Sequence, residues 1–385
     1  MIITFFSNVY PYPKRGYHPG IERVVESFSN ELVKKGHEVH VITTYRNGGE
    51  KEEESFNGVN IHRIKDSRDR FGKIGSAFSL DVLSMNWGLT KYLDIIIESD
   101  ILHVFTPFLV NRPKTPIVSH FHHGERIRSL VDILYLPINN YFWKRTFNSS
   151  KTIICVSNHS AKYLNSRGIS LYKIAIVPNG VDFDSFNRYA ESDIIKKIGN
   201  KFGENKIILY VGPLIKRKGL EHLIRGMKNV LSKRTDVFLV LVGKGKNEKK
   251  LTRLSLQLGI AENVVFEGFV EEKSLPAYYT SCDIFVLPSL QEGFGMVLVE
   301  AMACGKPVIA SNNTAIPEVV GDAGVLVDPR SPNGLADAII DLLNDEEKMR
   351  ELGEKALKRV QENFTWDSSA DKLLRIYRGL MGLSA

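Results

Sequence analysis

Short apolar segments alternate with amphipathic stretches along the chain, and this alternation constrains the fold more than any other feature. Residues 1–6 are apolar, a loop rich in proline and glycine follows, and residues 21–35 are amphipathic before a second apolar run at 38–43. This order predicts a βαβ unit. Further strands are expected at residues 59–64, 101–105, 116–121, 152–156 and 173–177.

A second series of strands begins at residue 206. Residues 206–212 (KIILYVG) and 237–243 (VFLVLVG) are continuously apolar, as in strands that both faces of a parallel sheet bury. More strands are expected at 264–266, 283–288, 307–311 and 324–328. The turn signal Pro178, Asn179, Gly180 separates the two series.

The two series predict two doubly wound α/β domains of the Rossmann type, at residues 1–180 and 181–365. A last helix at 366–385 is expected to pack back on the first domain. Such sheets bind ligands at the carboxyl ends of their strands, so the active site is expected in a central cleft that both domains face.

Composition narrows the class of protein but does not choose a function. Hydrophobic residues make up 43% of the 385 residues and charged residues 25%, as in folded globular proteins. The excess of 51 Lys and Arg over 44 Asp and Glu favours phosphorylated ligands, nucleic acid or anionic lipid alike. Cys155, Cys282 and Cys304 lie far apart in apolar stretches, which predicts buried thiols in a reducing compartment.

The segment from 287 to 311, LPSLQEGFGMVLVEAMACGKPVIAS, combines a strand end, a glycine loop, a helix and another strand. Glu292 and Glu300 are eight positions apart, about two helical turns, so both carboxylates can reach one extended ligand. Carboxylates suit sugar hydroxyls, and amides at the helix start suit a phosphate. The loop residues expected to contact the ligand are Gly293, Phe294, Gly295 and Met296.

This segment resembles the Glu-x7-Glu signature of glycosyltransferase family 4, a group of retaining enzymes with the two-domain GT-B fold. The resemblance continues through CVSNHSAKYL at 155–164, VPNGVD at 177–182 and VGPLIKRKGLEHLI at 211–224. It implies transfer of a hexosyl group from a UDP- or GDP-sugar to a glycan, a lipid-linked acceptor or another hydroxyl. Neither a metal nor a cofactor takes part in the reaction that the resemblance implies.

The resemblance also implies roles for single residues. Glu292 contacts the sugar hydroxyls, Glu300 binds the ribose and Lys218 grips the donor diphosphate. The residues themselves agree, because Lys216, Arg217 and Lys218 form a cationic cluster directly before a helix. Pro213 stands where the family usually has an arginine, so we expect Arg217 to supply the missing phosphate contact.

Three histidines end the strand expected at 116–121. Matching the family's Phe-His pair assigns the active-site histidine to His122. His120 and His122 share one face of a strand and His123 points away, and no nearby pattern of Asp, Glu or Cys residues completes a metal shell. We therefore expect no metal here, although an ordinary strand-end histidine remains an alternative for His122.

Two loops of the family have weaker counterparts. The opening loop with Gly16 and Gly20 resembles the glycine loop near the donor phosphates, and Gly20 is the candidate donor contact. EGFV at 267–270 matches the loop that reads the nucleobase, which suggests Val270. Asp182 and Asp184 resemble a metal-binding Asp-x-Asp but follow a turn, which favours capping.

Residues 126–145 mix apolar, aromatic and basic side chains. They are compatible with peripheral contact to an anionic membrane, or with a buried helix pair broken at Pro137. No signal peptide or spanning segment is expected, which places the protein in the cytoplasm, with the inner face of a membrane as an option.

Two other function classes stay open at this point. A nucleotide-sugar epimerase of similar fold converts the donor without an acceptor. A noncatalytic protein that binds sugar nucleotides or nucleic acid has no turnover, and the paired acids argue against a nucleic-acid groove.

Overall fold

The computed structural model describes residues 1–8, 10, 20–45, 51–65, 78–109, 114–122, 130–188 and 192–383. It divides into two compact units, one formed by Met1–Pro178 with Ser369–Ala385 and the other by Asn179–Ser368. Each unit is described by itself below. Gly16, Pro19 and His123 of the sequence predictions lie outside the described residues.

The first unit is built on a sheet in the order β3-β4-β2-β1-β5-β6-β7-β8. The strands pair in parallel except β3, which pairs antiparallel with β4. The strands are β1 (Ile2–Phe6), β2 (Glu38–Tyr45), β3 (Glu53–Phe56), β4 (Val59–Lys65), β5 (Ile101–Val104), β6 (Ile117–Phe121), β7 (Thr152–Cys155) and β8 (Ile174–Ile176). The polar segment EESF of β3 was not predicted, because it has no buried face.

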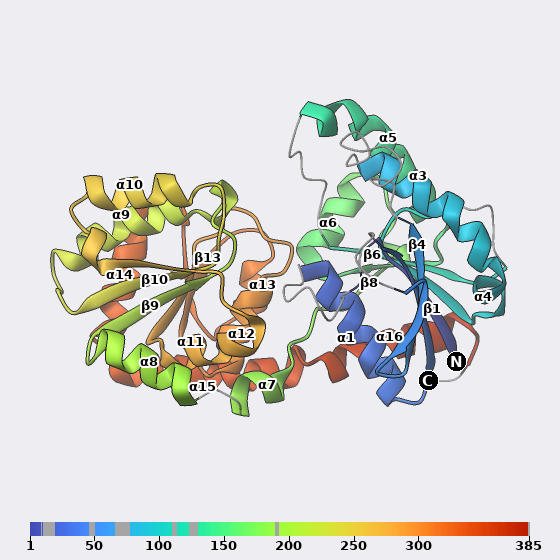
Figure 1. Cartoon of the computed structure of the whole chain (residues 1–385). Helices are drawn as coiled ribbons and strands as arrows, with labels where there is room; N and C mark the ends of the chain where they lie inside the picture. Colours follow the sequence, from blue (N-terminus) through green and yellow to red (C-terminus); the bar gives the residue numbers. More distant parts are fainter. Residues whose placement is uncertain are drawn as a thin grey trace. The chain divides into compact units, whose positions relative to one another are not determined.

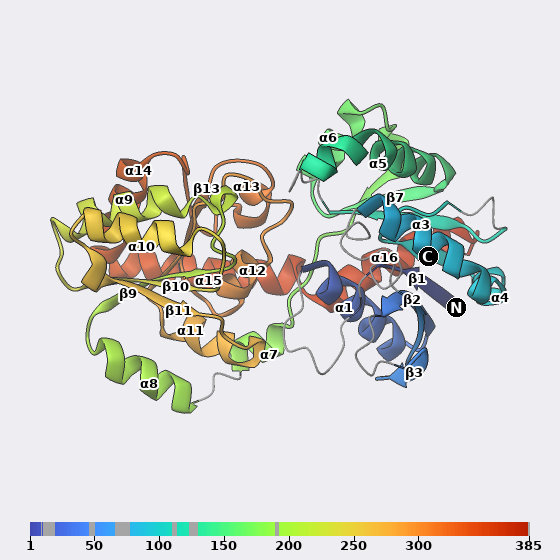
Figure 2. The same cartoon turned by 45° about the horizontal axis from the view of Figure 1, so that its top comes forward.

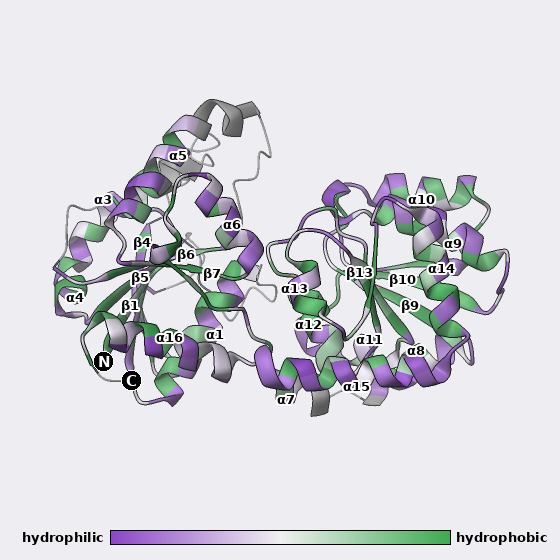
Figure 3. Ribbon diagram, turned by 180° about the vertical axis from the view of Figure 1, so that it is seen from behind, coloured by the Kyte–Doolittle hydropathy of each residue, from purple (hydrophilic) through white to green (hydrophobic). Residues whose placement is uncertain are grey.

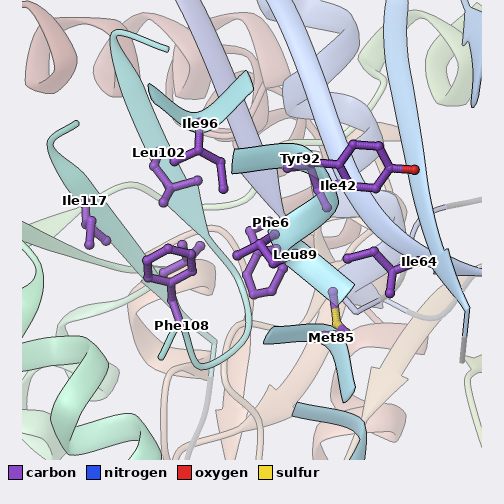
Figure 4. Packing of buried hydrophobic residues seen from close by; sticks show 11 residues of the cluster. Phe6, Ile42, Ile64, Met85, Leu89, Tyr92, Ile96, Leu102, Phe108 and Ile117 are labelled. Carbon is purple, nitrogen blue, oxygen red and sulfur yellow. The ribbon is translucent and has the colours of Figure 1, made fainter. Parts of the chain in front are cut away.

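Helices cover both faces of this sheet (Figures 1 and 2). They are α1 (Gly20–Lys34), α3 (Phe78–Gly88), η2 (Leu89–Tyr92), α4 (Leu93–Glu98), α5 (Leu130–Ser149), α6 (Asn158–Ser166), η3 (Leu171–Lys173) and α16 (Trp366–Leu380). On the α3 and α4 side, Phe6, Ile42 and Leu102 from three strands pack with Met85 and Leu89 (Figure 4). This cluster fixes the register of the central strands, because a slip of one residue turns those side chains to the other face.

One alternative for residues 126–145 is wrong in the structure. Helix α5 runs from Leu130 to Ser149 with Pro137 inside it, rather than as two helices broken at that proline. Ile138 and Tyr141 of this helix are exposed. Contact with a membrane stays a prediction, and no described helix is both long and apolar enough to cross a bilayer.

The second unit has a wholly parallel sheet in the order β11-β10-β9-β12-β13-β14. Its strands agree with the predicted ones to within two residues at each end. They are β9 (Lys206–Val211), β10 (Val237–Val242), β11 (Val264–Gly268), β12 (Ile284–Leu287), β13 (Val308–Ser311) and β14 (Val325–Val327). Both faces are covered, and Figure 3 shows the central strands as hydrophobic ribbons between helices with hydrophilic turns.

The helices of the second unit separate by face, with α9, α10 and α14 on one side and α8, α11 and α12 on the other (Figure 1). Their bounds are α7 (Phe183–Arg188), α8 (Ser192–Phe202), η4 (Lys216–Lys218), α9 (Leu220–Leu231), α10 (Glu248–Gln257), η5 (Ala261–Asn263), η6 (Glu272–Ser274), α11 (Leu275–Ser281), α12 (Met296–Ala303), α13 (Ile316–Val320), α14 (Pro332–Leu343) and α15 (Glu346–Asn363).

Side-chain caps begin several of these helices. Ser331 accepts a hydrogen bond from the Gly334 amide at the start of α14, and Asp345 accepts one from Lys348 at the start of α15. Asp182 accepts from the amide and the hydroxyl of Ser185 ahead of α7. The capping interpretation of the Asp182-x-Asp184 pair is therefore confirmed for Asp182.

Candidate functional site

The strand order of the second unit fixes where a ligand site can form. Connections from β9 run outward through β10 to β11, whereas β12 lies on the other side of β9 and continues to β13 and β14. The order therefore reverses between β9 and β12, which are hydrogen-bonded neighbours. Ligands of doubly wound sheets bind at such a reversal, beyond the carboxyl ends of the strands. The loops that follow β9 and β12 are residues 212–219 and 288–295.

These two loops are held together by backbone contacts. The Leu290 amide donates to the Arg217 carbonyl at 2.7 Å. Gly219, with φ of +68°, ends the short turn η4 and begins α9. A Cβ atom at this position would lie 2.0 Å from the Pro288 carbonyl oxygen, so only glycine permits the approach. The cationic turn is thus fixed against the loop that carries Glu292.

Lys218 and Glu292 form a buried ion pair at this point. The Lys218 Nζ donates to Glu292 Oε1, and Ser289 Oγ donates to the same oxygen at 2.8 Å. Lys218 is 5% exposed and Glu292 is 9% exposed. Arg217 completes the group, because its guanidinium donates to the Gln291 carbonyl at 2.9 Å and lies 3.4 Å from Glu292 Oε2. The structure therefore brings together three of the predicted site residues.

The carboxylate of Glu292 stays ionised in this setting. Burial opposes its charge, but the positive charges of Lys218 and Arg217, with the hydrogen bonds from Lys218 and Ser289, hold its pKa below the usual value. The Arg217 Nε is buried without a hydrogen-bond partner among the described residues. Most buried N–H groups are paired, so this atom is an exception within the described part of the site.

Two residues of this site were missed by sequence reasoning. Ser289 bonds Glu292 directly, and Thr314 Oγ1 accepts from the Glu292 amide at 3.2 Å. Thr314 has φ of +54°, an uncommon conformation for a β-branched residue. No sequence pattern indicated Thr314, since it lies 22 positions beyond Glu292. The serine in LPSLQE was a usable signal, because it directly follows the apolar strand.

The glycine loop leads into α12. Phe294 does not face a ligand: it is buried and packs edge-to-face on Phe364, with ring centroids 5.6 Å apart. The ring therefore anchors the loop, and a contact of Phe294 with the donor stays a prediction that only its backbone could fulfil. Gly295, with φ of +98°, turns the chain so that Met296 begins the helix. The positive end of the α12 dipole therefore starts a few residues after Glu292.

Glu300 occupies a different environment from Glu292. It lies on α12 with 1% exposure, and its Oε2 accepts a hydrogen bond of 2.7 Å from the hydroxyl of Tyr279 on α11. Tyr279 is itself fully buried. The structure brings Glu292 and Lys218 together. That Glu292 and Glu300 reach one ligand, and that Glu300 binds the ribose, both stay predictions.

The remaining predicted donor contacts lie at helix or strand ends. Val270 is half-buried just beyond β11, at the same carboxyl edge of the sheet as residues 212–219. Gly20 of the first unit is exposed at the start of α1, and a Cβ atom there would meet nothing within 4 Å. The described structure therefore gives no steric reason for glycine at position 20.

His122 lies just beyond β6 of the first unit and is half-buried. Its ring stacks on that of His120, with centroids 4.4 Å apart and an interplanar angle of 12°. The prediction that the two histidines share a face of the strand is confirmed.

Comparison with known proteins identifies the class. The family described as Glycosyltransferase Family 4 matches residues 19–185, and the one described as Glycosyl transferases group 1 matches residues 191–359. An uncharacterized glycosyltransferase of Methanocaldococcus jannaschii is 29% identical over 357 residues, which cover 90% of this chain and 91% of the relative.

Two further matches extend over nearly whole chains. A GDP-mannose-dependent alpha-(1-6)-phosphatidylinositol monomannoside mannosyltransferase of Mycolicibacterium smegmatis is 26% identical over 393 residues, 97% of each chain. The structure of sucrose-phosphate synthase from Thermosynechococcus elongatus superposes with a TM-score of 0.83 at 23% identity, over 100% of both chains.

The two parallel-sheet domains and these matches define a glycosyltransferase of the GT-B fold. The chain belongs to the family 4-type GT-B glycosyltransferases.

Proposed function

We propose that the chain is a retaining hexosyltransferase that takes its sugar from a UDP- or GDP-sugar without a metal ion. The observation that carries this proposal is the buried contact between the Lys218 ammonium and the Glu292 carboxylate at the strand-order reversal. A hexosyl diphosphate has an anionic phosphate directly beside a ring of hydroxyls. A cation and a carboxylate within hydrogen-bond distance of each other fit those two neighbouring parts.

The charges near Lys218 suit a diphosphate leaving group. An ammonium has three N–H donors, so Lys218 can bond Glu292 and still address phosphate oxygens. Arg217 adds a second cation in place of the arginine that Pro213 replaces, and the start of α12 adds a partial positive charge. We assign the diphosphate to Lys218, Arg217 and the amides of 293–296, and the sugar hydroxyls to Glu292.

The remaining contacts of the proposed donor site come from the family resemblance. We infer from it that Glu300 binds the ribose, that the backbone of Val270 contacts the base and that Gly20 supplies a donor contact. His122 is the active-site histidine of the first unit. The acceptor is a glycan, a lipid-linked sugar or another hydroxyl compound.

The proposed reaction forms one bond and breaks one at the anomeric carbon. The bond from that carbon to the diphosphate oxygen breaks as the acceptor oxygen attacks on the same face, and a phosphate oxygen takes the acceptor proton. The protein positions both partners and stabilises the charge that develops on the diphosphate. Lys218, Arg217 and the α12 amides carry that stabilisation, a role that a metal ion fills in other glycosyltransferases.

The donor class is tested by ligand-induced stabilisation. A UDP- or GDP-hexose at about 100 times its Kd is expected to stabilise the protein by about 2.7 kcal/mol. Thermal unfolding is measured with UDP-, GDP- and ADP-sugars on the wild type and on Lys206→Met, a control that removes the ion pair with Asp283 at the amino end of β9. Both proteins should respond alike. Absence of a shift with every UDP- and GDP-sugar would show that the proposed donor is wrong.

Retention is tested on the product. An α-linked donor is expected to yield an α-linked product, and NMR of the anomeric proton reads the configuration directly. The same spectra follow donor incubated without acceptor, in which an epimerase would accumulate a second sugar. An inverted product contradicts the proposed same-face attack, and an acceptor-independent second sugar favours the epimerase alternative.

A further inference from the structure

A chain of buried polar side chains leads from the C-terminal helix to His122. Tyr377 of α16 bonds through its hydroxyl to His103 Nδ1 on β5, and His103 Nε2 lies 3.1 Å from His120 Nδ1 on β6. His120 in turn stacks on His122. Tyr377 and His103 are fully buried and His120 is 1% exposed. The four side chains belong to one compact unit, which includes Ser369–Ala385.

The protons on these hydrogen-bonded side chains can be assigned by starting from the Tyr377 hydroxyl. Burial raises the pKa of Tyr377 well above its usual value, so its hydroxyl keeps its proton. Burial also lowers the pKa of His103 to about 3, and lowers that of His120 well below the usual range, so both imidazoles are neutral. A buried hydroxyl that donates to no acceptor is costly, so we assign the Tyr377 hydroxyl as the donor and His103 Nδ1 as the acceptor.

The direction of every later bond follows from that first one. Because His103 accepts at Nδ1, its single proton is on Nε2, and this N–H donates to His120 Nδ1. His120 therefore carries its own proton on Nε2. That atom is buried and has no hydrogen-bond partner among the described residues. Both ring position and tautomer of His120 are thus set by a hydroxyl that lies 257 positions later in the sequence.

Aromatic packing makes the arrangement rigid. The ring of Phe105 stacks on His103 and on His120, with centroids 4.7 Å apart in each case. The ring of Phe28 on α1 lies beside that of His120, with ring centroids 5.9 Å apart. A ring held by a hydrogen bond and by neighbouring rings is a fixed surface for His122 to stack on.

We propose that Tyr377, His103 and His120 are positioning residues that orient the imidazole of His122 for sugar transfer. This inference rests on the proposed function, in which His122 is the active-site histidine. Helix α16 then contributes to catalysis as well as to packing, because it supplies the Tyr377 hydroxyl at which the series of hydrogen bonds begins.

The test removes one oxygen atom. Tyr377→Phe keeps the buried ring and removes the donor to His103, and kcat is expected to fall about tenfold because His122 is no longer held in position. The KM for the donor should change less than twofold, since Lys218 and Glu292 belong to the other unit. The matched control is Tyr92→Phe, which removes another buried hydroxyl of the same unit, bonded to the Arg63 carbonyl at 3.2 Å. This control should keep kcat within twofold.

A double-mutant cycle separates positioning from a general loss of stability. In a His122→Ala background, Tyr377→Phe is expected to lower kcat less than twofold, because the side chain through which it acts is absent. An equal fall in both backgrounds, or no fall in either, overturns the proposal.

A measurement without substrate keeps this proposal separate from the proposed function. Nitrogen-15 spectra of the histidine rings should show shifted His103, His120 and His122 signals in Tyr377→Phe and unchanged ones in Tyr92→Phe. If the His122 signals are unchanged in both variants, the proposal that Tyr377, His103 and His120 position His122 is wrong. If the wild type transfers no sugar but the His122 signal shifts in Tyr377→Phe, the proposed function is wrong. The positioning of His122 by Tyr377, His103 and His120 is then still supported.

Discussion

Lys218→Met is expected to lower the rate of sugar transfer about a hundredfold to a thousandfold. The loss corresponds to about 2.7–4 kcal/mol of transition-state stabilisation, as expected for one preorganised charge at a developing anion. Methionine is one atom shorter than lysine but keeps an unbranched apolar stem, so the packing of the short turn before α9 is largely preserved. The measurement is kcat with saturating donor, which isolates the chemical step from donor binding.

The same change carries a cost in stability that sequence alone did not indicate. Removing one partner of a buried ion pair leaves the other charge uncompensated, at about 3–5 kcal/mol. Arg217 and Ser289 still contact Glu292, which favours the lower end of that range. Assays are therefore run well below the unfolding midpoint of the variant. Lys206→Met, at the other end of β9, is the control, and a comparable loss of transfer in that variant would show that fold damage is responsible.

Glu292→Gln is expected to lower transfer about a hundredfold, with a smaller loss of stability than Lys218→Met. Glutamine has the shape of glutamate, and its carbonyl oxygen can accept from Ser289 and Lys218. It loses the charge that strengthens hydrogen bonds from sugar hydroxyls. The measurements are kcat, KM for the donor and the unfolding midpoint.

Glu221→Gln is the matched control, because it removes a carboxylate that pairs with Lys250 on the surface of α9 and α10. It should transfer sugar at the wild-type rate. Near-normal turnover of Glu292→Gln would contradict the assignment of the sugar hydroxyls to this carboxylate.

Glu292 and Glu300 are held by different parts of the structure. Eight positions correspond to about two turns, so an acid in the loop and an acid on the helix were expected to reach one ligand, and this expectation stays a prediction. Glu292, however, precedes α12 and its direction is set by the loop, by Lys218 and by the Thr314 hydroxyl. Glu300 is inside the helix and meets Tyr279 of α11. Spacing fixes directions only within one regular element.

The sequence by itself determined the class of fold and the place of the candidate donor site. Apolar runs that alternate with helical patterns predicted two doubly wound domains, because strands buried on both faces leave few other arrangements. The Glu-x7-Glu segment and the cationic turn at 216–218 each directly follow such a run. Both were therefore expected at the carboxyl edge of the second sheet, where the structure has them.

Only the tertiary structure decided which side chains meet. The Lys218 and Glu292 contact joins residues 74 positions apart, and it forms because β9 and β12 are neighbours although two strands lie between them in the chain. The bond from Tyr377 to His103 joins residues 274 positions apart. Local patterns carry the preference of each segment for helix or strand, but hydrogen bonds between distant segments depend on strand order and helix packing, which no local pattern encodes.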